Sequence, residues 1–180
     1  MVLAEVDPAT VALARANIAA NGLEGRARAV EVDILKPAAR RAAGLADGAA
    51  TLVLTNPPFH APGAARASPD ADRARAHMGQ AGPWMKAALA LLAPGGRFLM
   101  IHRPDALADI LDAAEGRLGA LRLKPVLPRA GAPAVRLLVA GVKASRAPLA
   151  ILPQLVLHEG DAFAPEAEAI HKGEADIDMR

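Results

Sequence analysis

Four consecutive residues that could carry chemistry, Asn56, Pro57, Pro58 and Phe59, come after Thr55, which follows directly on the apolar run 52–54. An apolar run of this length next to a rigid turn indicates a buried strand that delivers its carboxyl end to a loop, where open α/β sheets place their ligand sites. Each proline lacks an N–H group and holds φ near about −65°, so the turn offers carbonyl oxygens with few competing donors. Such a turn suits a substrate that brings N–H groups.

The chemistry that this turn fits best is attack by a planar amino group, such as that of adenine. The lone pair of such a nitrogen is delocalised into the ring until fixed oxygens accept both N–H bonds. The Asn56 side chain and the Pro57 carbonyl are the expected acceptors, and they favour a nitrogen that is becoming tetrahedral and positive. Phe59 would stack on the base, an interaction worth about 1–3 kcal/mol. The alternative is a stiff turn with a buried ring.

The sequence Asn-Pro-Pro-Phe resembles motif IV of the S-adenosylmethionine-dependent amino-methyltransferases, which methylate nitrogens of adenine, cytosine, guanine or glutamine. The resemblance implies the class I methyltransferase fold, a Rossmann-like α/β sheet with helices on both faces. It also implies that S-adenosyl-L-methionine is the cofactor and that Asn56, Pro57 and Phe59 are catalytic. Asn56 would in addition contact the cofactor, and Pro58 and Phe59 would hold the substrate.

The chain before this motif contains two further predicted strands, each with an acid at its end. The apolar run 1–6 carries Glu5 and stops at Asp7, before a predicted helix. The run 28–32 stops at Asp33. In nucleotide-binding α/β folds, an acid at the carboxyl end of a strand commonly accepts hydrogen bonds from ribose hydroxyls. The positions of these acids therefore favour a nucleotide-like ligand.

The resemblance assigns these strand ends to the cofactor. Glu5 would bind the ribose, Asp33 would accept from the adenine amino group, and Ile34 would pack on the adenine face. The alternative is that the acids only cap a helix or a turn, which fits Asp7 better than Glu5. Successive strand ends that carry Glu5, Asp33 and Asn56 favour one shared site over three separate caps.

A long segment rich in Ala, Arg, Gly and Pro separates Phe59 from Pro83. Loops of this length in compact domains are usually lids or binding loops. Its cations, Arg73 and Arg75 among them, could contact phosphates and so position an RNA substrate without reading its sequence. The alternative is a solvated, partly helical excursion in which the arginines serve solubility.

The second half of the chain follows the order of elements found in class I methyltransferases. The predicted elements are a helix at 83–92 and strands at 97–101, 120–126 and 135–142. Trp84 is expected to pack in the core, and the last two strands to form an antiparallel hairpin. The residues 136–139 and 155–159 resemble the C-terminal part of the bacterial tRNA (adenine-N6)-methyltransferase group. The last ten residues are charged, and we expect them to fray.

Composition limits the other classes of protein. The 180 residues suffice for one domain with a core, so we expect a single methyltransferase domain over 1–180. Hydrophobic residues make up 53% but aromatics only 2%, so aliphatic side chains must build the core. The absence of cysteine excludes disulfides and thiolate metal sites, and no metal is expected. Neither a signal peptide nor a membrane span is predicted, so the expected location is the cytoplasm.

The sequence departs from the family at its N-terminus. Class I methyltransferases place a first strand and a Gly-rich loop, which lies against the methionine part of the cofactor, before the strand end that Glu5 represents. No Gly-x-Gly loop followed by a helix occurs here. The sequence therefore predicts an incomplete, N-terminally truncated domain or a different start codon. The missing strand would lie between the strands that end at Glu5 and Phe59, whose edges would be unpaired. Weak cofactor binding or none would leave this chain inactive by itself.

The predicted function is S-adenosylmethionine-dependent N-methylation of an exocyclic amine, with adenine N6 in tRNA as the leading target. This function would place the protein in tRNA processing and RNA modification, with RNA as its partner. Two alternatives within the same enzyme class are methylation of a protein glutamine and of DNA adenine. The alternative from another class is a non-catalytic module that keeps the fold for binding RNA or protein.

Overall fold

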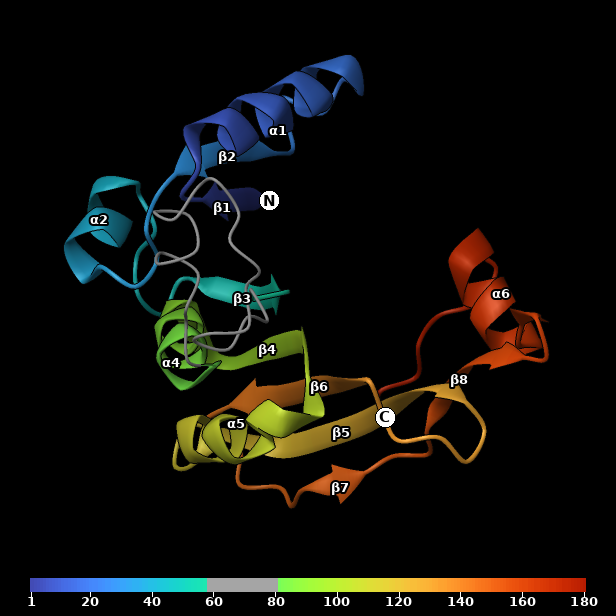
Figure 1. Ribbon diagram of the computed structural model, residues 1–180. Helices are drawn as coiled ribbons and strands as arrows, with labels where there is room; N and C mark the ends of the chain where they lie inside the picture. The colour runs from blue at the N-terminus through green and yellow to red at the C-terminus, as the bar shows by residue number, and fades with distance from the viewer. Residues whose placement is uncertain (58–80) are drawn as a thin grey trace, which may run out of the picture.

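The computed structural model describes residues 1–57 and 81–180, whose helices and strands alternate along the chain (Figure 1). In chain order they are β1 (Val2–Glu5), α1 (Pro8–Ala20), β2 (Arg28–Glu31), α2 (Pro37–Ala42), β3 (Ala50–Thr55), α4 (Ala81–Leu91), β4 (Leu92–His102), η1 (Pro104–Ala106), α5 (Leu107–Ala114), β5 (Leu118–Arg129), β6 (Arg136–Lys143), β7 (Ala150–Ile151), β8 (Leu155–Glu159), β9 (Ala162–Phe163) and α6 (Pro165–Lys172). This order confirms the predicted α/β class.

The larger of the two sheets has seven strands, in the order β3-β4-β6-β5-β8-β9, with β7 also paired to β5. β3 and β4 are parallel, while β6 is antiparallel to both β4 and β5, as the predicted hairpin requires. β8 runs parallel to β5. The strands β3, β4, β5 and β8 therefore end at one edge, which we call the carboxyl edge, and β6 begins there.

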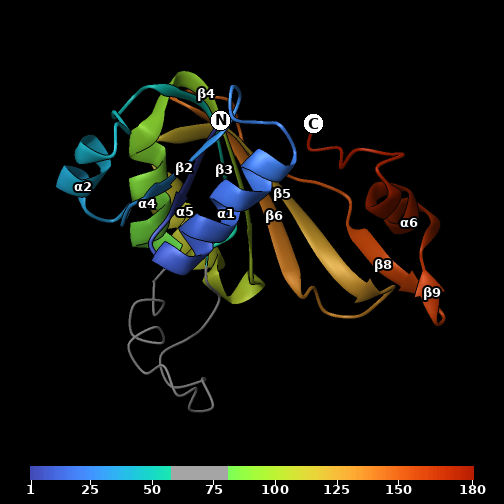
Figure 2. The same cartoon turned by 90° about the horizontal axis from the view of Figure 1, so that it is seen from above.

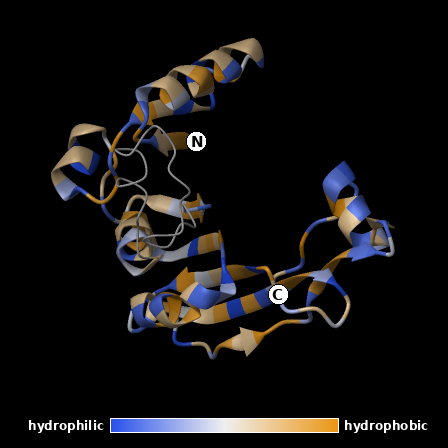
Figure 3. Cartoon of the chain, in the orientation of Figure 1, coloured by the Kyte–Doolittle hydropathy of each residue, from blue (hydrophilic) through white to orange (hydrophobic). Residues whose placement is uncertain are grey.

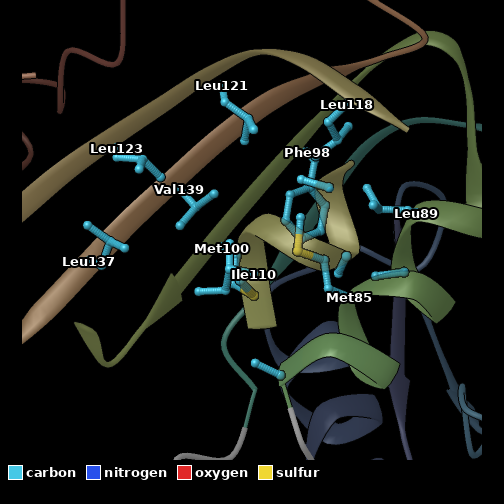
Figure 4. Close-up of a cluster of buried hydrophobic side chains, with 14 of the residues drawn as sticks. Met85, Leu89, Phe98, Met100, Ile110, Leu118, Leu121, Leu123, Leu137 and Val139 are labelled. Carbon is cyan, nitrogen blue, oxygen red and sulfur yellow. The ribbon is translucent and has the colours of Figure 1, made fainter. Parts of the chain in front are cut away.

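The main core lies between one face of this sheet and the helices α4 and α5 (Figure 4). Met85 and Leu89 of α4 and Ile110 of α5 are fully buried against Phe98 of β4. Aliphatic side chains of β5 and β6 extend the same cluster, as expected for a chain so poor in aromatic residues. A turn at Gly95, with φ +78°, connects α4 to the main part of β4 in a conformation that glycine tolerates without strain.

The smaller sheet is the parallel pair β1-β2, covered by α1. Asp7 caps α1: its Oδ2 accepts the backbone N–H of Thr10 at 3.0 Å and the Thr10 hydroxyl at 2.6 Å. Pro8 follows at the first helical turn, where its missing N–H costs nothing. The buried Val11 and Ile18 of α1 pack in a second cluster with alanines next to and within β2. Capping therefore confirms the helix start that the sequence predicts.

The described strands form two sheets, and the break lies between β1 and β3, where the sequence predicts unpaired strand edges. The β1-β2 pair lies beside β3, on the side away from β4 (Figures 1 and 2). Among the described residues β1 pairs with β2 and β3 pairs with β4, so each has one edge without a described partner. The expectation that residues 52–54 are buried is wrong: Leu52 is 54% and Leu54 is 76% exposed. Only Val53 points to the core, because successive side chains of a strand face opposite sides.

The C-terminal elements β7, β8, β9 and α6 extend the sheet beyond β5. The sequence predicts the run 155–159 only as a family resemblance and does not predict α6, whose C-cap is Gly173 at φ +74°. The end of α6 lies within the residues expected to fray. No helix in the described parts of the chain has the length and apolar character needed to cross a membrane.

Candidate functional site

The end of β3 presents the first two residues of the predicted catalytic motif. Asn56 is exposed and Pro57 is buried directly after β3. The preceding residue, Thr55, accepts a hydrogen bond from the indole N–H of Trp84, with 2.8 Å between Trp84 Nε1 and Thr55 Oγ1. Trp84 is half-buried in the first turns of α4. This bond ties the end of β3 to α4 and so restrains the backbone that leads into Asn56.

The rest of the predicted substrate site lies outside the described residues. This applies to Pro58, to Phe59 and to the cations Arg73 and Arg75. Their proposed roles in stacking and phosphate contact therefore remain predictions.

Glu5 closes β1, and its carboxylate folds back on the following backbone. Its Oε1 accepts the N–H of Val6 at 2.6 Å and the N–H of Asp7 at 3.2 Å. The second oxygen, Oε2, takes no part in these two bonds. Two backbone donors on one oxygen hold the carboxylate in a defined orientation. A fixed carboxylate of this kind can accept hydrogen bonds from the hydroxyls of a ribose.

Asp33 follows β2 and shapes the turn that carries Ile34. Its Oδ1 accepts the N–H of Leu35 at 3.0 Å, and its Oδ2 lies 3.2 Å from Lys36 Nζ. The first bond is the local turn that aspartate commonly stabilises. The ion pair is a surface one, with Lys36 73% exposed, and contributes little to stability. Asp33 thus has the turn role that the sequence left open, and this role is compatible with accepting an amino group.

A buried arginine donates a hydrogen bond to the main chain of the same turn, and no sequence pattern identifies it in advance. Arg40 of α2 is only 4% exposed. Its Nη1 donates to the carbonyl oxygen of Ile34 at 2.7 Å, and its Nη2 pairs with Asp47 Oδ1 at 3.1 Å. A guanidinium can make both contacts because its donors form a planar fork. Arg40 therefore fixes the main chain at Ile34, next to Asp33.

Of the predicted cofactor residues, Glu5, Asp33 and Ile34 lie near one another at the smaller sheet, whereas Asn56 directly follows β3 of the larger sheet. Glu5 pairs in register with Glu31, and the N–H of Val32 donates to the Glu5 carbonyl at 2.8 Å. Asp33 is the next residue along the chain, so the two acids stand at the ends of adjacent parallel strands. Asn56 stands at the end of β3.

The end of β4 adds a histidine and a pair of charges to the carboxyl edge. Burial lowers the pKa of His102 below its ordinary value of 6.5, so its ring is neutral near pH 7. Arg103 pairs with Asp105 at 2.7 Å. A hollow of about 390 Å³ opens beside them. Its lining consists of Arg103, Pro104, Asp105, Ala134, Val135 and Arg136.

Comparison with known families decides what this arrangement is. Residues 1–113 match the family described as "Methyltransferase small domain". The chain belongs to this methyltransferase family. Membership in this family confirms two predictions made from the sequence: the protein is a methyltransferase, and its cofactor is S-adenosyl-L-methionine. The described residues hold no cluster of three or more histidine, cysteine or acidic side chains that could bind a metal ion.

Solved structures share the fold of the methyltransferase. A predicted O-methyltransferase from Agrobacterium tumefaciens is 29% identical with a TM-score of 0.79, and the match covers 98% of this chain and 78% of that one. A type I restriction-modification methyltransferase subunit from Streptococcus thermophilus is 16% identical with a TM-score of 0.58, over 97% of this chain and 42% of that one. An rRNA-methylase, described as putative, from Clostridium thermocellum is 13% identical with a TM-score of 0.52, over 80% and 72%. A search of curated proteins found no match.

Proposed function

We propose that this methyltransferase transfers the methyl group of S-adenosylmethionine to an exocyclic amine, with adenine N6 of tRNA as the target. The observation that carries the proposal is the end of β3, where an exposed Asn56 is followed by the buried Pro57. The Trp84 bond to Thr55 restrains this backbone. A restrained acceptor is most effective in the transition state, because it does not have to reorganise as charge develops.

The proposed reaction needs no side-chain base at its start. The cofactor supplies a methyl group on a positively charged sulfur. When bound, the cofactor would donate this methyl group to the amine nitrogen that Asn56 and Pro57 hold, and its sulfur would keep the electron pair of the broken C–S bond. The Asn56 side-chain oxygen and the Pro57 carbonyl accept the two N–H bonds and stabilise the positive charge on nitrogen. The extra proton leaves to water after the transfer, and Phe59 would hold the base by stacking.

The adenosine part of the cofactor would lie at the ends of β1 and β2. The oriented carboxylate of Glu5 would accept the ribose hydroxyls. Asp33 would accept the adenine amino group, and Ile34 would pack on the ring. Because Arg40 holds the Ile34 carbonyl at 2.7 Å, the backbone of this turn is set before the cofactor arrives. Asn56 would also contact the cofactor, and the site would belong to a single domain over 1–180.

The motif residues favour a nitrogen over an oxygen as the methyl acceptor. A hydroxyl group usually has to lose its proton to a nearby base to become a good nucleophile. Asn56 and Pro57 cannot take a proton, but both offer oxygens that accept N–H bonds. This argument sets the proposal apart from the predicted O-methyl transfer in the name of the Agrobacterium protein. The alternative targets are adenine in DNA and a glutamine of a protein.

Methyl incorporation tests the proposal. The protein would be incubated with methyl-labelled S-adenosylmethionine and, in parallel, with unmodified tRNA, DNA and release-factor protein. We expect label in tRNA, recovered as N6-methyladenosine after digestion, and its loss in Asn56→Ala. Asn17→Ala, an exposed asparagine of α1, is the matched control and should keep wild-type activity. Label on a hydroxyl oxygen, or in DNA or protein alone, would refute the tRNA adenine assignment.

Calorimetry separates an enzyme from a non-catalytic binding module. Titration with S-adenosylhomocysteine would be run on this chain and on one extended upstream. The extended chain should give saturable binding that Glu5→Ala weakens and Asn56→Ala leaves nearly unchanged, and the chain as given should bind weakly or not at all. A protein that binds RNA but neither binds the cofactor product nor incorporates methyl groups would be the binding module instead.

A further inference from the structure

A stack of three rings lies on the C-terminal extension of the sheet. The ring centroids of His158 and Phe163 are 5.0 Å apart, and those of Phe163 and His171 are 5.7 Å apart. The planes are inclined by only 21° and 22°. His158 is half-buried, with Nδ1 3.2 Å from the Pro128 carbonyl oxygen, whereas His171 is exposed. One end of the stack is therefore anchored on the sheet and the other faces solvent.

The exposure of this stack is unusual for a chain with so few rings. The whole sequence has three phenylalanines and one tryptophan. Phe98 is completely buried in the core, but Phe163 is 47% exposed. In both views α6 lies at the end of the large sheet far from α2 (Figures 1 and 2), and most of its residues are hydrophilic (Figure 3). Packing of the core does not account for the position of these rings.

Arginines occupy the carboxyl edge between Asn56 and the stack. Arg103 follows β4 and Arg136 opens β6, and both line the hollow of about 390 Å³. Arg129 ends β5 and is in register with His158 of β8. Each of the strands β4, β6 and β5 therefore brings one guanidinium to the edge at which β3 ends, and the stack follows on β8 and β9.

We propose that this edge is a binding track for a single-stranded nucleic acid. The track comprises Arg103, Arg129, Arg136, His158, Phe163 and His171. The arginines contact phosphates, and an unpaired base adds a fourth ring to the stack at its exposed end. Proteins that bind single strands combine a cationic groove with aromatic platforms in this way, because every base has a flat face. The proposal rests on the proposed function in that it takes the methylated substrate to be a nucleic acid.

The distance along the sheet from β3 to β9 is too long for a mononucleotide to span, so the ligand of the whole track has to be a polynucleotide. Five strand steps separate β3 from β9, and at about 4.8 Å per step the path along the sheet is about 24 Å. At about 3.4 Å per stacked nucleotide this path corresponds to roughly seven nucleotides. A base at the stack is therefore several nucleotides away from a base held at Asn56. The stack contributes to the binding of an extended strand and not to that of a mononucleotide.

The carboxyl edge carries acidic side chains as well as arginines, and this mixture argues against an acidic protein as the partner. Asp105 pairs with Arg103, and Glu159 and Asp161 lie beside the stack. A partner that is recognised only through its negative charge would be repelled by these carboxylates. A nucleic acid gains in addition from stacking, which the rings supply and a carboxylate-rich peptide cannot use.

Fluorescence anisotropy with a labelled, unstructured 12-nucleotide RNA tests the track directly. We expect Phe163→Leu and His171→Ala each to raise the dissociation constant about tenfold, which corresponds to about 1.4 kcal/mol and falls in the range for one stacked base. Arg129→Gln should reduce the salt slope by about 0.7, the value for one phosphate contact on a single strand. The matched controls are Ile151→Ala, an apolar side chain that is 72% exposed on β7, and Arg146→Gln, an exposed arginine away from this edge. Both should bind as wild type does.

The outcomes separate this proposal from the proposed function. Wild-type affinity in both ring variants, with unchanged melting temperatures, overturns the track even if tRNA is methylated normally. A polyglutamate peptide that competes as well as RNA also overturns it. Binding that depends on the rings without any methyl incorporation keeps the track and removes the methylation proposal.

Discussion

Replacing Arg40 by methionine tests whether this buried cation holds the turn at Ile34. Methionine has a similar length and fills a buried position well, so the change removes the guanidinium while it preserves most of the packing. It leaves the Ile34 carbonyl without its 2.7 Å donor and Asp47 without its partner at 3.1 Å. The perturbation therefore acts on two named contacts of one side chain.

The magnitude follows from the exposure of the two partners. A hydrogen bond that involves a charged group, such as the part-buried one from Arg40 to the Ile34 carbonyl, is worth about 1.5–3 kcal/mol. The pair with Asp47 adds little, because the Asp47 side chain is 55% exposed and solvent screens it. The buried Nε of Arg40 has no hydrogen-bond partner in the described residues, so its removal offsets part of the loss. We expect a net loss of about 2 kcal/mol, or about 4–8 °C in melting temperature for a domain of this size.

Thermal unfolding followed by circular dichroism measures this loss without any ligand. Arg41→Met is the matched control, because Arg41 is the next residue of α2 and is exposed. It should shift the melting temperature by less than about 1 °C, as expected for a surface substitution. Arg40→Lys should be intermediate, since a lysine can keep one contact but not the fork. If Arg40→Met had the same melting temperature as Arg41→Met, the hydrogen bond to the Ile34 carbonyl would not stabilise the turn.

Three further predictions concern the ends of β3 and β4. Asn56→Ala should lower kcat and kcat/KM together by about 10²–10³-fold, because the Asn56 side-chain oxygen acts in the transition state. If initial-rate measurements gave a near-normal kcat, the turn would have a structural role and no catalytic one. Thr55→Val removes the acceptor of the Trp84 indole N–H, and we expect the free energy of unfolding, measured by chemical denaturation, to fall by about 1–2 kcal/mol. Adding Trp84→Phe to the same chain should largely cancel this loss, because the unpaired donor is then removed as well. Equal losses in the single and double variants would contradict this prediction. Because burial lowers the pKa of His102, the unfolded chain takes up that proton first as the pH falls below 6.5, and stability is lost between 6.5 and the lowered pKa. The melting temperature should therefore fall more steeply from pH 7 to pH 5 in wild type than in His102→Gln, and identical slopes would remove His102 as the cause.

Local patterns in the sequence predicted the elements that depend on nearby residues. The cap at Asp7 with Pro8 after it predicts the start of α1, because the cap bonds to a residue only three positions away. The hairpin of β5 and β6 follows from two apolar runs joined by a short turn. The strand ends at Glu5, Asp33 and Asn56 were located for the same reason, since each lies where an apolar run stops. Phe59 and its neighbours lie outside the described residues, so their part of the site remains a prediction.

The tertiary structure decided the contacts between residues far apart and the exposure of each face. Trp84 was expected to act only in core packing, yet it bonds to Thr55, which is 29 residues away in the sequence. Arg40 and Arg41 are consecutive arginines that the sequence does not distinguish, and only the packing of α2 buries Arg40 and leaves Arg41 exposed. Leu52 and Leu54 were expected to be buried, and their exposure depends on which elements lie against that face of β3. The physical reason is that periodicity reports which side chains share a face, whereas burial and partnership depend on what the rest of the chain places against it.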